Sequence, residues 1–493
     1  MAFTESEESK LRTIISAFEN GQQIDDLAVA SAAVQDKEIE VFDKTTGASG
    51  RMGLRDAVQM ANAPYFARYW NMDSATPTAA GWEGSLEFGQ NLPDELGLGC
   101  YLVKNDHSRR KLDPTNHYRF ATGEKAKLDG SMGHYQWGWG KTFYIAFWQQ
   151  ARRFYVGISL SPIAGKWNHR IPVGSMSASG HACMERSTST LVSYINDDPN
   201  YRGGDNYTGY DGTPKTLCGR AVTGITTEAA RAAARRNGSG WLAGTMRHSA
   251  VVKVLFEVIF GTRNIQASYN ASRDANGLYQ GGLGSGVTNC GGAWSTHYGY
   301  RPFLHTSAGV ELADSCGIAN TEVKDADGNV IYTAPVPVFF GLKNLYGYLW
   351  RLQDDEFGKC NEDGSITHLV APSIYGSWTC GVETGMKPYS TTPPTGEGYI
   401  KSMAYDKLEM FPTETGASES TYMCDYFWNV SGATSGFRLV LRGCSAHDGS
   451  RSGVSAVSVY DVVSYSYVYV GAPLCEAVEE WMVEPEYAEV RSF

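Results

Sequence analysis

One stretch near the C-terminus constrains the fold of this chain more than any other. It spans residues 442–475 and reads RGCSAHDGSRSGVSAVSVYDVVSYSYVYVGAPLC, and residues 445–470 within it include no Trp, Gln, Met, Lys, Glu or Asn. Tyr465, Tyr467 and Tyr469 alternate with smaller residues, and this period of two predicts a β-strand with the three tyrosines on one face. Such a face resembles an antibody paratope more than a catalytic pocket, because tyrosine gives stiff contact area and serine gives adaptable hydrogen bonds.

The composition limits the classes of protein to consider. The chain has 493 residues, too many for one ordinary core, so we expect two or three domains. Its net charge of -11 and its pI near 5.5 argue against a nucleic-acid partner, which would favour a basic surface. No apolar run is long enough to span a bilayer, and the polar N-terminus MAFTESEESKLRT lacks the apolar stretch of a signal peptide. We therefore expect synthesis in a cytoplasm and no membrane insertion.

The sequence offers no clear site for a metal or another cofactor. Its ten cysteines are spread singly without a CxxC pair, so neither a zinc site nor a redox dithiol is indicated, and we expect mostly buried free thiols. Residues 321–333, TEVKDADGNVIYT, predict a β-hairpin with Asp327-Gly328 at its tip. Asp325 and Asp327 resemble part of a calcium loop, but the later glutamate ligand is absent, which favours the turn. We expect no cofactor and no metal.

The N-terminal part of the chain divides into two segments. Residues 1–60 predict a mostly helical leader with an apolar stripe, which either packs on the body of the chain or serves attachment and oligomerisation. Residues 61–215 are rich in glycine and aromatic residues and predict a β-rich middle domain, with strands over 143–147 and 154–160. Within it, the run Trp137-Gly-Trp139 could stack on a sugar ring, but a β core is the favoured interpretation.

The C-terminal part mixes helices and strands. Thr226 or Thr227 caps a first helix that stops at Asn237-Gly238, and a second helix runs over residues 246–260 and stops at Gly261. The polar glycine tract at 281–294 lacks the GxGxxG spacing of a phosphate loop, and FRLVLR at 437–442 predicts a strand. The expected fold class is therefore α+β.

The order of these elements resembles a known family. Gly-Ser-Gly-Trp at 238–241 links the two helices, the motif Gly-Leu-x-Asn-x-x-Gly-x-Leu-Trp follows at 341–350, and Leu-Arg-Gly at 441–443 leads into the tyrosine-rich stretch. The pattern is similar to the C-type-lectin-like fold of the formylglycine-generating or sulfatase-modifying type. More narrowly, it resembles the variable proteins of diversity-generating retroelements in phages and prophages of Bacteroides-type bacteria, whose variable region closes on GxPLC. The resemblance implies a C-type-lectin-like ligand-binding domain over residues 216–475, followed by an acidic C-terminal tail at 476–493.

The resemblance also implies which residues vary. In that family, copying errors at template adenines turn asparagine codons into many others but never into Trp, Gln, Met, Lys or Glu codons, and residues 445–470 lack these types. The implied constant residues are Gly443, Ala446, Gly449, Gly453, Gly471 and Leu474. The implied variable, outward-pointing and ligand-binding residues are Ser445, His447, Asp448, Arg451, Ser458, Tyr460, Asp461, Tyr465, Tyr467 and Tyr469.

Two features depart from the family pattern. Arg351 follows Trp350 where the family often has an acidic residue, and the chain continues past Cys475 into the tail, which predicts a short helix over 476–483 or a docking segment. Formylglycine-generating enzymes use cysteines in this part of the fold, so Cys444 and Cys475 are the candidates for catalysis. Neither cysteine has a base at a convincing spacing, and the chain has no GxSxG motif, so we expect no enzyme.

These inferences together predict a non-enzymatic virion fibre or adhesin of a phage or prophage. Its hypervariable face would bind a bacterial surface glycan or protein, and its N-terminal segment would bind other virion proteins. A homotrimer, the frequent state in the family, would add avidity. The alternatives are a purely structural virion component such as a head fibre or decoration protein, a cellular prophage protein that binds a peptide or protein partner, and a formylglycine-generating-type enzyme.

Overall fold

A computed structural model gives the structure of the chain. It describes residues 38–42, 49–53, 64–204, 207–212, 214–389, 392–405, 408, 410–430 and 435–481. The leader predicted at residues 1–60 lies mostly outside these ranges. Its described part, β1 (Glu38–Phe42) and β2 (Ser49–Gly53), forms an antiparallel hairpin, so the prediction of helix is wrong there. The alternation of Glu38-Ile39-Glu40-Val41 has the period of two that is typical of a strand.

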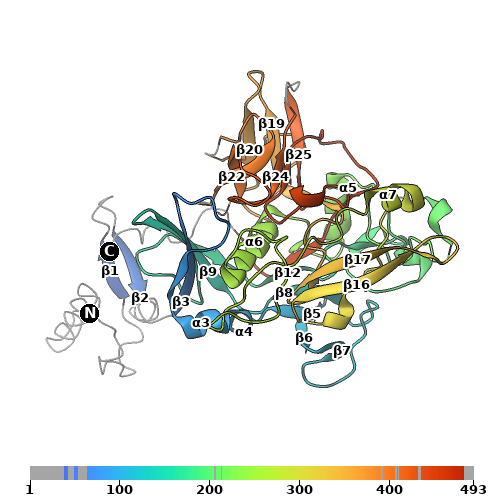
Figure 1. Cartoon of the computed structure of the whole chain (residues 1–493), viewed down its shortest axis with the longest axis horizontal. Coiled ribbons are helices and arrows are strands. Elements are labelled where there is room, and N and C mark those ends of the chain that lie inside the picture. Colours follow the sequence, from blue (N-terminus) through green and yellow to red (C-terminus); the bar gives the residue numbers. More distant parts are fainter. Residues whose placement is uncertain are drawn as a thin grey trace.

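The described residues form a β-rich fold with few helices, and one sheet is curled (Figure 1). This architecture is consistent with a lectin-like β fold, while the α+β class and the order of domains stay predictions. A five-stranded sheet has the order β11-β9-β10-β3-β4. Its strands are β11 (Asn168–Ile171), β9 (Phe143–Gln150), β10 (Arg153–Ser159), β3 (Tyr65–Asn71) and β4 (Gly81–Gly84). The two strands predicted at 143–147 and 154–160 are thus confirmed as β9 and β10.

A seven-stranded sheet joins segments that are far apart in the sequence, in the order β15-β28-β12-β8-β5-β6-β7. Its strands are β15 (Trp241–Ala243), β28 (Leu474–Ala477), β12 (Gly174–Ser177), β8 (His134–Trp139), β5 (Gly99–Val103), β6 (Arg109–Asp113) and β7 (Asn116–Phe120). Strands from both sides of the predicted boundary at residue 215 share this sheet, and the four-part domain division stays a prediction. Trp137 and Trp139 on β8 are fully buried, which confirms the prediction that they belong to a core.

The C-terminal tail begins inside this seven-stranded sheet. Glu476 and Ala477 belong to β28, which pairs with β12 on one side and β15 on the other, and the described residues up to Trp481 contain no helix. The helix predicted to start at residue 476 is therefore wrong in this range. The reason is non-local: two remote strands take the backbone hydrogen bonds of residues 474–477.

A nine-stranded sheet stands at the top of Figure 1, in the order β21-β20-β19-β25-β26-β24-β22-β23, with β27 paired to β19 outside this path. Its strands are β21 (Lys387–Pro388), β20 (Ile366–Val370), β19 (Trp350–Cys360), β25 (Gly436–Arg442), β26 (Val457–Ser458), β24 (Tyr426–Trp428), β22 (Gly398–Ala404), β23 (Phe411–Thr415) and β27 (Val470–Gly471). The strand predicted at 437–442 is confirmed as β25, and it pairs antiparallel with β19.

Two smaller sheets contain the remaining strands of the described residues. They are the pair β13 (Cys183–Glu185) and β14 (Thr190–Val192), and a three-stranded sheet of β16 (Gly317–Lys324), β17 (Val330–Phe339) and β18 (Leu342–Lys343). Strands β16 and β17 form the predicted hairpin. The carboxylate of Asp325 accepts hydrogen bonds from the backbone of Asp327 and Asn329 at 2.9 Å each, which confirms the turn interpretation at its tip.

The two predicted long helices are confirmed. Helix α5 (Thr227–Arg235) begins after Thr226, whose hydroxyl accepts from the backbone nitrogen of Ala229 at 3.3 Å. Helix α6 (Met246–Phe260) begins after Thr245 and ends at Gly261, a left-handed residue at φ 63°. Short helical segments are α3 (Leu86–Gln90), α4 (Leu92–Leu96), α7 (Gly291–Ala293), a π-helical turn at Trp294–Tyr298, and 3₁₀ turns at Pro199–Tyr201, Thr208–Tyr210, Val310–Leu312 and Gly449–Arg451.

Helix α6 is the centre of the core. Every residue of the helix except Ser249 is buried, and it contacts β3, β10 and β19, which belong to two different sheets (Figure 1). All ten cysteines are free, and seven of them are buried, as expected from their single spacing. None of the helices among the described residues is long and apolar enough to cross a membrane.

Candidate ligand-binding face

The tyrosine-rich stretch forms two loops on the nine-stranded sheet. The first loop, residues 443–456, leaves β25 and returns to β26, and the second loop, residues 459–469, connects β26 to β27. Strand β27 pairs parallel with β19, and the chain then enters β28. We call residues 443–456 and 459–469 together the C-terminal loops.

The strand predicted over Tyr465, Tyr467 and Tyr469 is wrong. This segment turns instead: the backbone nitrogen of Tyr465 donates to the carbonyl of Val462, and that of Val470 donates to the carbonyl of Tyr467, both at 2.9 Å. A period of two in the sequence does not require a strand when the neighbouring backbone offers other hydrogen-bond partners.

The three tyrosine rings nevertheless gather at one place. The rings of Tyr465 and Tyr467 are stacked, with centroids 5.8 Å apart and planes 6° from parallel. The ring of Tyr467 meets that of Tyr469 edge to face at 4.6 Å, and the hydroxyls of Tyr465 and Tyr469 lie 3.3 Å apart. Tyr467 is 44 % exposed, while the other two are partly buried. The result is an aromatic surface in which the Tyr467 ring is exposed and the Tyr465 and Tyr469 rings are partly buried.

Residues outside the tyrosine-rich stretch extend this surface. Tyr300 lies edge to face with both Tyr469 (6.3 Å) and His447 (6.1 Å), and it brings the two C-terminal loops together. Trp294, which is buried, lies beneath Tyr469 with its ring centroid at 6.3 Å. We call Tyr300, His447, Tyr465, Tyr467 and Tyr469 the aromatic patch. Tyr300 and Trp294 were not among the predicted site residues: Trp294 is the last residue of the glycine tract at 281–294, and no sequence spacing indicates that either ring lies beside Tyr469.

The first loop is held by polar side chains, two of its own and one from outside it. The carboxylate of Asp448 accepts hydrogen bonds from the backbone nitrogen and the hydroxyl of Ser445, both at 2.7 Å. Burial raises the pKa of Asp448, and these hydrogen bonds oppose the rise. The side-chain amide of Gln266 donates to the carbonyls of Gly449 (3.2 Å) and Ser452 (2.6 Å). Ser445 and Asp448 therefore shape the loop in this sequence.

The ten predicted ligand-binding residues differ in accessibility. Ser445 and Ser458 are each only 4 % exposed, so the expectation that all ten point outward is wrong for these two. His447, Arg451, Tyr460 and Tyr467 are exposed, and Asp448, Asp461, Tyr465 and Tyr469 are partly buried. Whether the ten bind a ligand stays a prediction.

A second group of aromatic residues lies beside Arg451. The guanidinium of Arg451 lies 4.9 Å from the ring centroid of Tyr426 on β24. The Tyr426 ring packs edge to face on Tyr399, with centroids 5.2 Å apart. The hydroxyl of Tyr399 in turn lies 3.0 Å from that of Ser450. The first loop therefore contacts the aromatic patch through His447 and this second group through Arg451.

The second loop carries one carboxyl group with an altered proton affinity. Burial raises the pKa of Asp461 to about 6, and Arg438 on β25 opposes the rise. Asp461 follows Tyr460, which is 56 % exposed. The charge that the second loop carries at Asp461 therefore changes around pH 6.

Backbone hydrogen bonds fix the C-terminal loops to the rest of the molecule. They run from Ala446 N to Tyr348 O (3.0 Å), Val459 N to Trp428 O (3.0 Å), Leu439 N to Asp461 O (2.8 Å), Gly224 N to Tyr467 O (2.9 Å) and Trp350 N to Tyr469 O (3.0 Å). None of these bonds involves a side chain. The anchoring of the loops therefore does not depend on their exposed side chains, whereas the buried side chain of Ser445 and the partly buried one of Asp448 shape the first loop.

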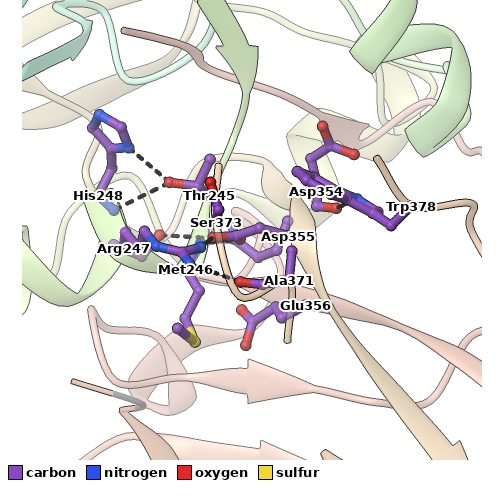
Figure 2. Close-up of polar contacts among 12 residues, drawn as sticks. Thr245, Met246, Arg247, His248, Asp354, Asp355, Glu356, Ala371, Ser373 and Trp378 are labelled. Atoms are coloured by element: carbon purple, nitrogen blue, oxygen red, sulfur yellow. Dashed lines mark hydrogen bonds and ion pairs between the residues drawn. The ribbon is translucent and has the colours of Figure 1, made fainter. Parts of the chain in front are cut away.

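Strand β19, to which β27 is anchored, carries three consecutive buried acids. Asp354 pairs with Arg231 at 2.6 Å, Asp355 pairs with Arg247 at 2.6 Å, and Glu356 pairs with Arg442 at 2.6 Å; His368 adds a further contact to Glu356 at 2.9 Å. Figure 2 shows Arg247 between Asp355 and the carbonyl of Ala371. These pairs join β19 to α5, α6 and β25.

Two opposing effects set the pKa of each of the three acids: burial raises it, and the paired cation lowers it. Burial raises the pKa of Asp354 to about 6 in spite of Arg231, and burial likewise raises that of Asp355. Burial would also raise the pKa of Glu356, but Arg442 and His368 outweigh it and lower the pKa. Each carboxylate is fully buried and paired with a cation, so the three pairs connect β19 to α5, α6 and β25 beneath the loops.

The two candidate catalytic cysteines are unsuited to attack a substrate. Cys444 and Cys475 are fully buried, and burial raises the pKa of both thiols well above the ordinary value. The Cys444 thiol donates to the carbonyl of Arg451 at 3.6 Å, within its own loop. A nucleophilic cysteine requires an accessible thiolate, which neither environment provides.

Comparison with known proteins finds distant structural likenesses. No protein-family model and no curated protein matches this chain. Among solved structures, the chain is similar to the "Major Tropism Determinant U1 Variant" at 9 % identity and the "Major Tropism Determinant P3c Variant" at 8 % identity. Each comparison covers 92 % of this chain and 98 % of the other chain, with a TM-score of 0.24. The likeness is too distant to carry an argument about function.

Proposed function

We propose that this chain is a non-enzymatic attachment protein of a virion whose C-terminal loops display a variable face to a bacterial surface ligand. One observation carries the proposal: five aromatic residues from two loops and a third segment converge in the aromatic patch, with Tyr467 and His447 exposed. Tyrosine rings in such a cluster lose little conformational entropy on binding and offer both an apolar face and a hydroxyl.

The support for a variable face comes from how the loops are held. Their anchoring hydrogen bonds join backbone atoms to β19, β24, β25 and neighbouring segments, so exposed side chains can change while the loops keep their positions. The side chains of the exposed residues His447, Arg451, Tyr460 and Tyr467 take no part in these bonds. A rigid support under replaceable contact residues is the general arrangement of a diversified binding surface.

The experiment that tests this function measures binding of the tagged full-length chain to a panel of intact bacteria by flow cytometry. Tyr467→Ala is compared with Tyr118→Ala, a matched control because Tyr118 on β7 is 51 % exposed. We expect Tyr467→Ala to weaken binding at least tenfold, about 1.4 kcal/mol, as for a contact residue at the centre of an interface. Tyr118→Ala should leave binding unchanged. Equal effects of the two substitutions, or binding to none of the cells, would instead favour a purely structural virion component.

A further inference from the structure

Three side chains of metal-ligand type converge at a place distant from the C-terminal loops in the sequence. Cys100 lies on β5, His117 on β7, and Asp314 in the segment after the 3₁₀ turn Val310–Leu312. The Cys100 sulfur, an imidazole nitrogen of His117 and a carboxylate oxygen of Asp314 all lie within 4.8 Å of one another. Sulfur, nitrogen and oxygen ligands at such separations need only small side-chain movements to meet around one ion.

One ligand atom of this cluster has no partner. The Asp314 side chain is 9 % exposed; its Oδ1 accepts hydrogen bonds from the backbone nitrogen of Cys100 and from His117 Nε2, both at 2.9 Å. Its Oδ2 is buried and forms no hydrogen bond. A buried carboxylate oxygen without a partner is costly, and a cation would satisfy it.

The imidazole is already oriented as in a metal site. His117 Nδ1 lies 2.6 Å from the hydroxyl of Tyr135, which leaves Nε2 directed to Asp314. Histidines that bind metals usually fix the second ring nitrogen in this way. Lys343 contacts the same Tyr135 hydroxyl, and its charge also acts on Cys100 and Asp314.

We propose that Cys100, His117 and Asp314 form a buried site for a zinc-like divalent cation. One thiolate, one imidazole and one carboxylate are the donors that zinc prefers, whereas calcium and magnesium prefer oxygen donors alone. Binding replaces the thiol proton of Cys100, which leaves to solvent, and the single imidazole proton moves from Nε2 to Nδ1, where it faces the Tyr135 hydroxyl, so that neutral Nε2 bonds to the ion. The thiolate and carboxylate then neutralise the two positive charges.

The surroundings are shaped around these ligands. A Cβ atom added to Gly341, which has φ 94°, would lie 2.7 Å from the Cys100 sulfur and 2.8 Å from Asp314 Oδ1. One added to Gly99 would collide with the Asp314 carboxylate. Both glycines therefore allow the backbone to approach the cluster closely. An ion here would join the segment at 310–314 to β5 and β7.

The experiment titrates the metal-stripped full-length chain with Co²⁺ and then Zn²⁺, with absorption spectroscopy and metal analysis as readouts. We expect one Co²⁺ per chain, a near-ultraviolet band from a single thiolate ligand, visible bands of a tetrahedral ion, and displacement by Zn²⁺. Cys100→Ala should abolish the thiolate band. Cys183→Ala, which removes an equally buried thiol on β13, should keep it.

Two outcomes would overturn the proposal. The first is a wild-type chain that binds no Co²⁺, in which case Lys343, Tyr135, His117 and Asp314 form a metal-free hydrogen-bonded chain. The second is a thiolate band that Cys183→Ala removes as well. Should Cys100→Ala fail to fold, X-ray absorption of the zinc-loaded wild type decides: one sulfur at about 2.3 Å supports the site, and a shell of nitrogen and oxygen alone overturns it. Neither result depends on what the C-terminal loops bind.

Discussion

The backbone nitrogen of Trp350 donates a hydrogen bond to the carbonyl of Tyr469 at 3.0 Å. This bond joins the last tyrosine of the aromatic patch to the first residue of β19, the strand that also carries the three buried acids. The Trp350 side chain is buried and packs edge to face on Trp428 at 5.0 Å, so the patch rests on an interior strand. The supporting strand and the aromatic patch meet at this pair of residues.

The first prediction concerns tolerance to substitution. Tyr467→Ser should change the free energy of unfolding by only about 1 kcal/mol, because the residue is 44 % exposed and loses only its contacts to Tyr465 and Tyr469. Trp350→Ala should cost about 3–5 kcal/mol, because it leaves a cavity under the loops. Urea denaturation measures both. Equal losses would contradict the distinction between support and surface.

The second prediction concerns the buried pair of Glu356 and Arg442. Arg442→Met should destabilise the chain by about 3–5 kcal/mol, because it leaves a buried carboxylate without its main partner. The double variant with Glu356→Gln should recover part of this loss. Because the folded-state pKa of Glu356 is lowered, its stabilising effect is present above the unfolded pKa and is lost as the pH falls through the folded pKa. A double variant no more stable than Arg442→Met would contradict the pairing.

The third prediction concerns Asp461. Its folded pKa is raised to about 6 from 3.8, so the folded chain binds this proton more tightly than the unfolded chain. The resulting stabilisation is complete below the unfolded pKa and is lost as the pH rises through about 6. Asp461→Asn should flatten the stability of the chain between these two values relative to wild type. Thermal unfolding across this pH range checks the difference, and parallel profiles would show that Asp461 does not titrate there.

The fourth prediction concerns the thiols. Cys444 and Cys475 are fully buried with raised pKa values, whereas Cys218, Cys316 and Cys380 are partly exposed. Iodoacetamide should therefore modify Cys444 and Cys475 only after unfolding, as measured by peptide mass spectrometry of native and denatured samples. Rapid native modification of Cys444 would revive the enzyme hypothesis.

Local signals predicted several elements of this fold. The caps at Thr226 and Gly261 define helix ends within one or two residues, and Asp327-Gly328 marks a hairpin, because these residues act on their own neighbours in the chain. The aromatic run at 137–139 lies in the core, as predicted, because the burial of large apolar rings is favourable.

Non-local contacts explain why the structure differs from the sequence-based predictions for the tyrosine-rich segment and the start of the tail. Residues 465–469 alternate like a strand, but Trp350 and Gly224 take their backbone hydrogen bonds and hold them as a turn. Residues 474–477 become a strand because β12 and β15, more than two hundred residues away in the chain, pair with them. Tyr300 joins the aromatic patch through a contact that no sequence spacing indicates.

The central claim is that a bacterial surface ligand contacts the aromatic patch. A photoreactive phenylalanine analogue placed at position 467, and in a control at the similarly exposed position 118, tests it on intact bacterial cells that bind the full-length chain. The account predicts light-dependent capture of a cell-surface molecule from position 467 and none from position 118. Capture from position 118 alone, or equally from both positions, would contradict it.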